Sequence, residues 1–315
     1  MSAPSGGGAS RDGYGNALLR LAENSDVVVL EADLGKSTKS CHFRSKYPER
    51  TFSLGIAEQN MMLVAAGLAS SGKIPMASTF AIFTERGFEQ IRNGIARPCL
   101  KAHICGSHGG IHTGSDGSSA QSIEDLAIYR TLPNMTIIHP ADDISAEELT
   151  MQVVDLEGPS YMRTIRNKVP RSYSEETKNE LKIGKGSLLR DGNDVVIICC
   201  GVMVSKSIDA AIILEKEGIN AAVIDMHTIK PLDEQMLDLW SKKCRCIVTA
   251  EDHSIIGGLG SAIAEHNSRT NLVPMEMIGV KDRFGESGDS EELFKIMSMT
   301  TEDIVKAARK SISRK

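Results

Sequence analysis

Glu58 is the residue of this sequence best placed for acid–base chemistry. It opens an apolar helical stretch (57–71) directly after the strand-like segment TFSLGI (51–56). A carboxyl group held in a dry pocket can share a proton with a bound heterocycle. From spacing alone, however, the simpler interpretation is a first-turn acid that complements the dipole of its helix.

Two other features could form a binding site. Phe80 and Phe83 are three residues apart, so they could share a helix face and stack on a flat ring, although the core is the usual place for such side chains. The segment GSHGGIHTGSDGSSAQ (106–121) follows an apolar run and contains two histidines. It is longer than ordinary connections of about 2 to 6 residues. It should lie at the carboxyl end of a parallel strand, where α/β proteins bind ligands, so we interpret it as functional.

The common phosphate-loop and nucleophile motifs are absent. There is no G-x-x-x-x-G-K-[ST], no G-x-G-x-x-G after the first strand, and GSDGSS (114–119) lacks the frame of a nucleophile elbow. Cys244 and Cys246 have no second pair at zinc-ligand spacing, which favours buried structural thiols. GGLGSA (257–262) resembles a ligand-binding turn, but close packing of a helix on a strand explains its glycines better.

Composition and charge exclude several classes of protein. The 315 residues are 41% hydrophobic, and 36 Lys plus Arg against 41 Asp plus Glu give a net charge of −5, which argues against a general nucleic-acid binder. No apolar run approaches the roughly 20 residues that span a membrane. Residues 1–10 lack the regions of a signal peptide and are expected to be a flexible lead-in. Seven cysteines, mostly in apolar runs, indicate reduced, buried thiols and a cytoplasmic location.

Short apolar runs alternate with amphipathic stretches along most of the chain. The expected strands are 26–33, 74–80, 101–107, 135–141, 159–165, 193–201, 220–229, 245–252 and 274–280. The expected helices are 57–71, 83–96, 120–132, 205–217 and 233–242, one that opens within 257–267, and the tail. This alternation predicts an α/β fold of two tandem domains, each a mainly parallel sheet with helices on both faces. The domains are expected at 11–166 and 186–315, with the polar segment 167–185 as linker.

Three blocks of the first half are similar to the pyrimidine-binding domain of transketolase: SLGIAEQNMMLVAAGLA, ASTFAIFTERGFEQIRNGIA and SHGGIHTGSDGSSAQSIEDLAIYRTLPNM. The second half (DVVIICCG, MHTIKPLD, EDHSIIGGLGSAIAE and GVKDRFGESG) resembles the transketolase C-terminal domain. The GDG and later Asn of the family's magnesium- and diphosphate-binding domain are missing. The chain therefore resembles the C-terminal subunit of a split-gene transketolase. This implies an N-terminal subunit that holds the diphosphate and Mg²⁺, no metal site in this chain, and an α2β2 assembly.

The resemblance implies thiamine diphosphate as cofactor and transfer of a two-carbon ketol unit from a ketose phosphate to an aldose phosphate. Glu58 matches the catalytic glutamate that hydrogen-bonds a ring nitrogen of the aminopyrimidine. The other matches to cofactor-binding positions are Asp33 and Leu34 in a loop that approaches across a dimer interface, the stacking aromatics Phe80 and Phe83, and Arg86, where other members have a third aromatic.

The resemblance also implies a substrate site. Its residues are Arg11, Ser37, His108 (also catalytic), Asp116 and Arg166. Guanidinium, hydroxyl and imidazole groups suit a phosphate dianion, and Asp116 matches the aspartate that reads a sugar hydroxyl. The chain departs from the family at Ala120, where a histidine normally precedes the glutamine. This departure puts the rate or the substrate in doubt, and nearby His112 could compensate.

Two alternatives stay open. The first is a related enzyme half, either 1-deoxyxylulose 5-phosphate synthase-like or a 2-oxo acid dehydrogenase β subunit. The sugar-phosphate positions argue against the dehydrogenase, and the synthase is usually a single chain. The second is a catalytically retired subunit that scaffolds or regulates a partner. Only Ala120 favours it, because Glu58, Phe80 and Phe83 are intact.

Overall fold

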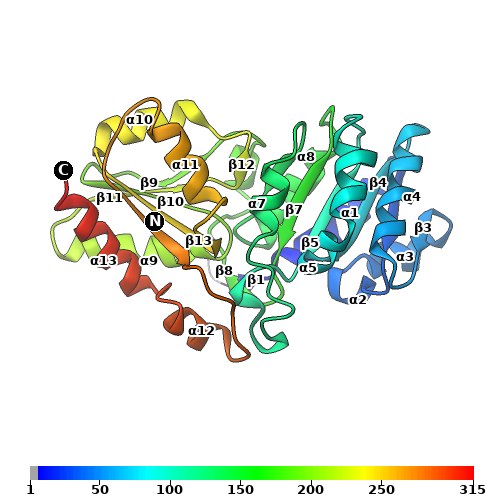
Figure 1. Cartoon of the computed structure of the whole chain (residues 1–315), viewed down its shortest axis with the longest axis horizontal. Coiled ribbons are helices and arrows are strands. Elements are labelled where there is room, and N and C mark those ends of the chain that lie inside the picture. Colours follow the sequence, from blue (N-terminus) through cyan, green and yellow to red (C-terminus); the bar gives the residue numbers. More distant parts are fainter. Residues whose placement is uncertain (1–5) are drawn as a thin grey trace.

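Two mainly parallel β-sheets organise the structure, a computed structural model that describes residues 6–315 (Figure 1). The first sheet has the strand order β12-β6-β7-β5-β4-β2-β3. Its strands are β2 (Val27–Glu31), β3 (Thr51–Ser53), β4 (Ile74–Phe80), β5 (His103–Ser107), β6 (Thr136–Ile138), β7 (Ser160–Thr164) and β12 (Thr228–Lys230). All of them run parallel except β12, which the second half of the chain adds antiparallel to β6.

Helices cover both faces of this sheet because its strands are apolar on both sides. Val27 and Val29 share one core with α1 (Ser10–Leu21) and α8 (Asp143–Val153), whereas Val28 and Leu30 share the other with α4 (Glu58–Ser70) and α7 (Asp125–Arg130). The shorter helices are α2 (Gly35–Thr38), α3 (Cys41–Lys46), α5 (Ala81–Thr84) and α6 (Phe88–Gln90).

The second sheet has the order β14-β13-β10-β11-β9, with only β9 antiparallel. Its strands are β9 (Ser187–Arg190), β10 (Val195–Cys199), β11 (Ala221–Asp225), β13 (Ile247–Ser254) and β14 (Met275–Val280). Helices α9 (Met203–Lys216) and α13 (Thr301–Ile312) share one core with it, and α10 (Glu234–Cys244) and α11 (Leu259–Asn267) share the other. Helix α12 (Ser290–Ile296) lies toward the first sheet's loops (Figure 1). The predicted fold class is confirmed.

Two predicted helices differ from the structure for packing reasons. The stretch 83–96 is divided among α5, a tight turn at 85–87, α6 and a π-helical segment at 91–96. Gly87 lies against α4, where a Cβ would come within 3.0 Å of Met62 Cγ, and this close approach bends the chain. The helix expected at 120–132 begins only at Asp125, because the buried Gln121 side chain is hydrogen-bonded to the carbonyls of Gly114 and Glu286 instead.

The expected flexible lead-in is wrong for residues 6–10. Strand β1 (Gly7–Gly8) pairs with β8 (Val169–Pro170), and the buried Ser10 hydroxyl accepts the Ile165 N–H at 2.7 Å. Residues 1–5 lie outside the described residues. The segment 167–185 is also more than a solvated linker, because Tyr173 is buried and donates to Asp225 at 2.7 Å.

The prediction about GGLGSA is confirmed. A Cβ on Gly258 would lie 2.1 Å from Glu251 Oε2, so the glycine lets α11 begin against β13. The seven cysteines are free, and five are buried; Cys99 is exposed and Cys41 is partly so.

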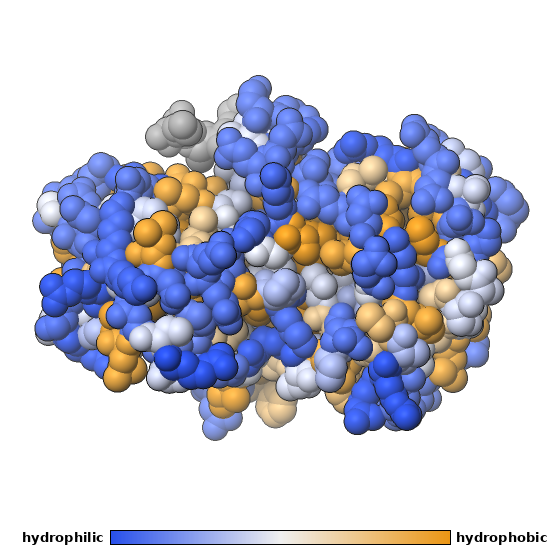
Figure 2. Space-filling model, turned by 90° about the horizontal axis from the view of Figure 1, so that it is seen from above, coloured by the Kyte–Doolittle hydropathy of each residue, from blue (hydrophilic) through white to orange (hydrophobic). Residues whose placement is uncertain are grey.

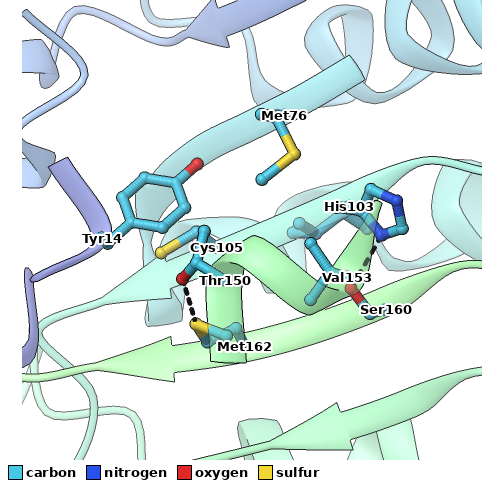
Figure 3. Close-up of a pocket in the computed structure, with 9 residues that line it drawn as sticks. Tyr14, Met76, His103, Cys105, Thr150, Val153, Ser160 and Met162 are labelled. Atoms are coloured by element: carbon cyan, nitrogen blue, oxygen red, sulfur yellow. Dashed lines mark hydrogen bonds between the residues drawn. The ribbon is translucent and has the colours of Figure 1, made fainter. Parts of the chain in front are cut away.

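The surface mixes charged and apolar side chains, and apolar patches reach the surface in the view from above (Figure 2). Within residues 6–315, no helix is long and apolar enough to cross a membrane. One cavity of about 10 Å³ is enclosed among Tyr14, Met76 and Cys105 (Figure 3). It has room for about one water molecule and is too small for a ligand.

Candidate active site

The predicted site residues other than Arg11, which lies in α1, follow or end five parallel strands of the first sheet at their carboxyl ends. Asp33, Leu34 and Ser37 follow β2, Glu58 follows β3, Phe83 and Arg86 follow β4, which Phe80 ends, His108 and Asp116 follow β5, and Arg166 follows β7. These strand ends are neighbours in the sheet: Phe80 pairs with Ser107, and Ser107 with Thr164. The sheet therefore gathers these segments at one edge, the usual place for ligands in such folds.

Three rings form the centre of the site. Phe80 and Phe83 are stacked with centroids 5.6 Å apart and an interplanar angle of 7°. The imidazole of His108 stacks on Phe80 at 4.0 Å and 21°. The aromatic pair and the histidine predicted from sequence therefore form one continuous stack.

His108 is neutral near pH 7. Burial and, to a smaller extent, the positive charges of Arg11 and Arg166 lower its pKa to about 3. Its Nε2 lies 3.5 Å from Arg11 Nη1, which can only donate, so Nε2 is the acceptor and Nδ1 carries the proton toward Ser107 Oγ at 2.8 Å. We assign this tautomer from these partners.

Arg11, Ser37 and Arg166 complete a polar cluster around the histidine. Arg11 donates to the Ser37 carbonyl at 3.1 Å, and burial lowers the pKa of its guanidinium. Arg166 Nη1 forms an ion pair with Asp116 Oδ1 at 2.6 Å. Two guanidinium groups and a neutral imidazole suit an oxyanion, and the carboxylate beside them can accept hydroxyl hydrogen bonds.

Glu58 begins helix α4 with only 2% of its surface exposed. Its Oε2 has no hydrogen-bond partner among the described residues, and Arg86 Nη1 lies 3.6 Å away without forming one. A buried carboxylate oxygen without a donor is costly, which points to a missing donor from a ligand. In contrast, Asp33 is exposed with a φ of 59°, and no hydrogen bond joins its side chain or that of Leu34 to the other described site residues.

His112, the histidine closest in sequence to Ala120 within this loop, packs toward the second domain. Its ring is buried against Phe294 of α12, with centroids 5.9 Å apart, and burial lowers its pKa to about 4. Among the described residues, no hydrogen bond or ring stacking joins its side chain to the polar cluster, and its Nδ1 has no hydrogen-bond partner.

Sequence reasoning missed two acids near the site, the buried Glu31 and the partly buried Glu85. Glu31 ends β2, forms an ion pair with Arg44 and accepts from Ser40 at 2.8 Å. A charged residue at the end of the apolar run DVVVLEAD was its only signal. Glu85 accepts from Ser122 at 2.5 Å, and burial raises the pKa of its carboxyl to about 8. Within residues 6–315, no group of three or more His, Cys, Asp or Glu side chains is placed to hold a metal ion.

Two family models match this chain. The transketolase pyrimidine-binding domain matches residues 8–172, and the transketolase C-terminal domain matches residues 184–304. The two domains are thus the pyrimidine-binding and C-terminal domains of transketolases. The chain belongs to the transketolase family, as a C-terminal subunit of the split-gene type.

Individual relatives agree with this assignment. A transketolase C-terminal section from Methanocaldococcus jannaschii is 42% identical over 94% of each chain. A 6-deoxy-6-sulfo-D-fructose transketolase subunit from Clostridium sp. is 39% identical over 97% of this chain and 95% of its own. The structure described as a split gene transketolase, inactive beta4 tetramer, is 45% identical, covers 98% of this chain and 99% of its own, and has a TM-score of 0.91. 1-Deoxy-D-xylulose-5-phosphate synthases also match, but the chain spans about half of their length.

Proposed function

We propose that this chain is the pyrimidine-site subunit of a thiamine diphosphate-dependent transketolase that moves a two-carbon ketol unit from a ketose phosphate to an aldose phosphate. The observation that carries the proposal is the buried Glu58 Oε2, which receives no hydrogen bond from the described residues and has only a 3.6 Å ion-pair contact with Arg86. A flat aminopyrimidine packed beside the Phe80–Phe83 pair is the kind of group that would hydrogen-bond to it. We assign residues 11–166 to the pyrimidine-binding domain and 186–315 to the C-terminal domain, joined by 167–185.

Thiamine diphosphate supplies the carbon nucleophile and the electron sink for cleavage of the sugar. Glu58 holds one ring nitrogen of the cofactor and moves a proton there, while Phe80, Phe83 and Arg86 fix the ring, with Asp33 and Leu34 approaching a second copy of the site. The family's GDG and later Asn are missing from the sequence, so we assign Mg²⁺ and the diphosphate to the partner subunit.

Arg11, Ser37, His108 and Arg166 bind the anionic end of the sugar, and Asp116 accepts a sugar hydroxyl. Neutral His108 can accept a hydrogen bond from a sugar hydroxyl at Nε2, where Arg11 Nη1 lies 3.5 Å away, because Nδ1 is committed to Ser107. The sulfonated sugar in the name of the Clostridium relative is compatible with such a site, because a sulfonate is also a tetrahedral oxyanion. A phosphorylated ketose remains the substrate class that we propose.

The partner is proposed to cover the surface beside Glu58. Three large apolar side chains close to Glu58 in sequence are exposed: Phe52 (37%), Ile56 (72%) and Leu63 (52%). Large apolar side chains gathered in this way mark interaction surfaces. An N-terminal transketolase subunit in an α2β2 assembly would cover them. A cytoplasmic location fits the seven free thiols.

The test uses the complex reconstituted with its N-terminal subunit. Glu58→Gln keeps the shape of the side chain but removes its charge, so we expect kcat to fall by about 10²- to 10⁴-fold, with the partner still bound. The exposed Glu49→Gln is the matched control and should keep full turnover. Unchanged turnover in Glu58→Gln would overturn the assignment.

Donor choice separates the alternatives. Consumption of pyruvate without ketose cleavage would identify a synthase-like or dehydrogenase-like half. Cofactor binding without turnover of any ketose phosphate would favour a scaffold.

A further inference from the structure

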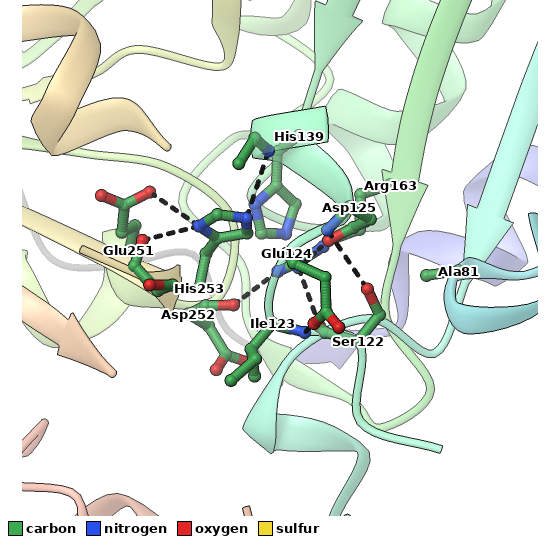
Figure 4. A network of polar contacts seen from close by, with 12 residues as sticks. Ala81, Ser122, Ile123, Glu124, Asp125, His139, Arg163, Glu251, Asp252 and His253 are labelled. Atoms are coloured by element: carbon green, nitrogen blue, oxygen red, sulfur yellow. Dashed lines mark hydrogen bonds and ion pairs between the residues drawn. The ribbon is translucent and has the colours of Figure 1, made fainter. Parts of the chain in front are cut away.

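Three consecutive buried ionisable residues, Glu251, Asp252 and His253, lie in β13 (Figure 4). Each accepts hydrogen bonds from a different segment. Glu251 accepts the N–H groups of Leu259 and Gly260, both at 2.7 Å, and so anchors α11 within its own domain. Asp252 and His253 instead reach the first domain. All three are completely buried.

Asp252 holds the loop that follows β5. Its Oδ1 accepts the N–H of Ile111 at 2.8 Å, and its Oδ2 accepts the N–H of His112 at 2.9 Å. Gly110 lies so close that a Cβ there would be 2.3 Å from Asp252 Oδ2, and its φ of +80° also requires glycine. The carboxylate therefore fixes three consecutive backbone units of this loop.

The same loop sets the position of His108. His108 has a left-handed φ of 61°, and its carbonyl accepts the Thr113 hydroxyl at 2.5 Å. Thr113 directly follows the two residues held by Asp252. The loop then continues to Asp116, which is paired with Arg166. Asp252 thus acts on His108 and Asp116 through backbone geometry, without touching either.

The backbone carbonyl of Asp252 is also held by a hydrogen bond. The buried Arg163 donates to the carbonyls of Asp252 and Ser122 and forms an ion pair with Asp125 (Figure 4). Charge-assisted hydrogen bonds of this kind are stronger than neutral ones. Strand β13 is therefore joined to Ile111 and His112 within the loop and, through Arg163, to Ser122 directly after it.

We propose that Asp252 is a positioning residue for the substrate site, by which the second domain holds His108 and Asp116 in the geometry that binds the sugar phosphate. The second domain thereby acts on the site through the backbone of this loop, which Ser290 of α12 also contacts at the carbonyl of His112. The identity of the substrate rests on the proposed function, but the loop-holding role does not.

The variant Asp252→Asn tests this proposal. An amide has the same shape, but its nitrogen is a donor, so it can accept only one of the two N–H groups. Glu251→Gln is the matched control, because this residue lies in the same strand, is equally buried and also accepts two N–H groups, but from α11.

The first measurement is amide hydrogen exchange in the full chain. We expect Asp252→Asn to speed exchange in residues 109–114 at least tenfold, whereas Glu251→Gln should speed it near 258–261 instead. The second is turnover by the reconstituted complex. With xylulose 5-phosphate as probe, we expect KM to rise at least tenfold for Asp252→Asn while kcat changes less. The preference for a phosphorylated over an unphosphorylated ketose should fall.

Thr113→Val provides an independent route if Asp252→Asn does not fold. It removes the link from the loop to the His108 carbonyl and should raise the same KM. Unchanged exchange in 109–114 would overturn the proposal, as would faster exchange with KM within twofold of the wild type. If the wild-type complex cleaves no ketose phosphate, the proposed function fails, but the exchange measurement still decides the role of Asp252 in holding the loop.

Discussion

The imidazole of His108 lies flat on the ring of Phe80, with centroids 4.0 Å apart. The sheet imposes this contact, because Phe80 at the end of β4 pairs in register with Ser107 at the end of β5. Phe80 therefore belongs to the proposed cofactor-binding pair and also contacts His108 of the proposed substrate site. A change in the position of either ring is transmitted to the other.

Phe80→Ala should weaken both cofactor and substrate binding, whereas Phe83→Ala should weaken cofactor binding alone, because Phe83 stacks on Phe80 and not on His108. A stacked aromatic pair contributes about 0.5–1.5 kcal/mol beyond its buried area, so we expect at least a few-fold change in each affected constant. The measurement is the cofactor Kd and the ketose KM of the reconstituted complex. Equal effects of both variants on KM would contradict the shared-ring arrangement.

His108 should remain neutral throughout the physiological pH range. Its folded pKa is about 3, below the ordinary value of 6.5, so the unfolded chain takes up a proton as the pH falls below 6.5 and the folded chain does not. This histidine therefore lowers the free energy of unfolding progressively from about pH 6.5 toward pH 3, by at most about 1.4 kcal/mol per pH unit. Ring nitrogen NMR shifts should stay constant from pH 8 to 5. A midpoint near 6.5 would contradict the assignment.

The buried ion pair of Arg163 with Asp125 should be far more sensitive than a surface pair. Arg163→Met leaves the Asp125 carboxylate without its main partner, and breaking such a pair costs about 3–5 kcal/mol. Arg20→Ala, which removes the exposed pair with Glu147, should cost about 0–1 kcal/mol. Urea unfolding of the two variants gives the comparison. Similar losses in both would show that burial does not set the cost.

Two helical glycines should respond to alanine in opposite directions. A Cβ on Gly13 would lie 2.0 Å from the backbone oxygen of Asp143, so Gly13→Ala must push α1 away from α8 and shift Arg11. Gly67 of α4 has nothing within 4 Å, so Gly67→Ala should stabilise the chain by about 0.5–1 kcal/mol. The measurement is thermal unfolding of the separate subunit. A stable Gly13→Ala variant would contradict the close crossing of these helices.

Local patterns predicted the strands well, because apolar runs such as DVVVLEAD and NDVVIICCG have few alternatives to burial on both faces. The strand-end site could also be anticipated, since parallel strands bring residues from separate motifs to one edge. Contacts between segments far apart in the sequence could not. No local pattern encodes the tertiary packing behind three features. These are the hydrogen bonds that Asp252 accepts from Ile111 and His112, the pairing of β12 with β6, and the pairing of Gly7 and Gly8 with β8.

The strand β12 limits how this gene could be cut or recombined. Residues 228–230 complete the edge of the first sheet, although their neighbours in sequence build the second one. A fragment ending in the polar segment 167–185 would lose that strand, and β6 would expose an unpaired edge open to aggregation. A recombination between relatives at this segment would pair β6 of one parent with β12 of the other. We therefore expect functional recombinants between relatives to keep β6 and β12 from the same parent.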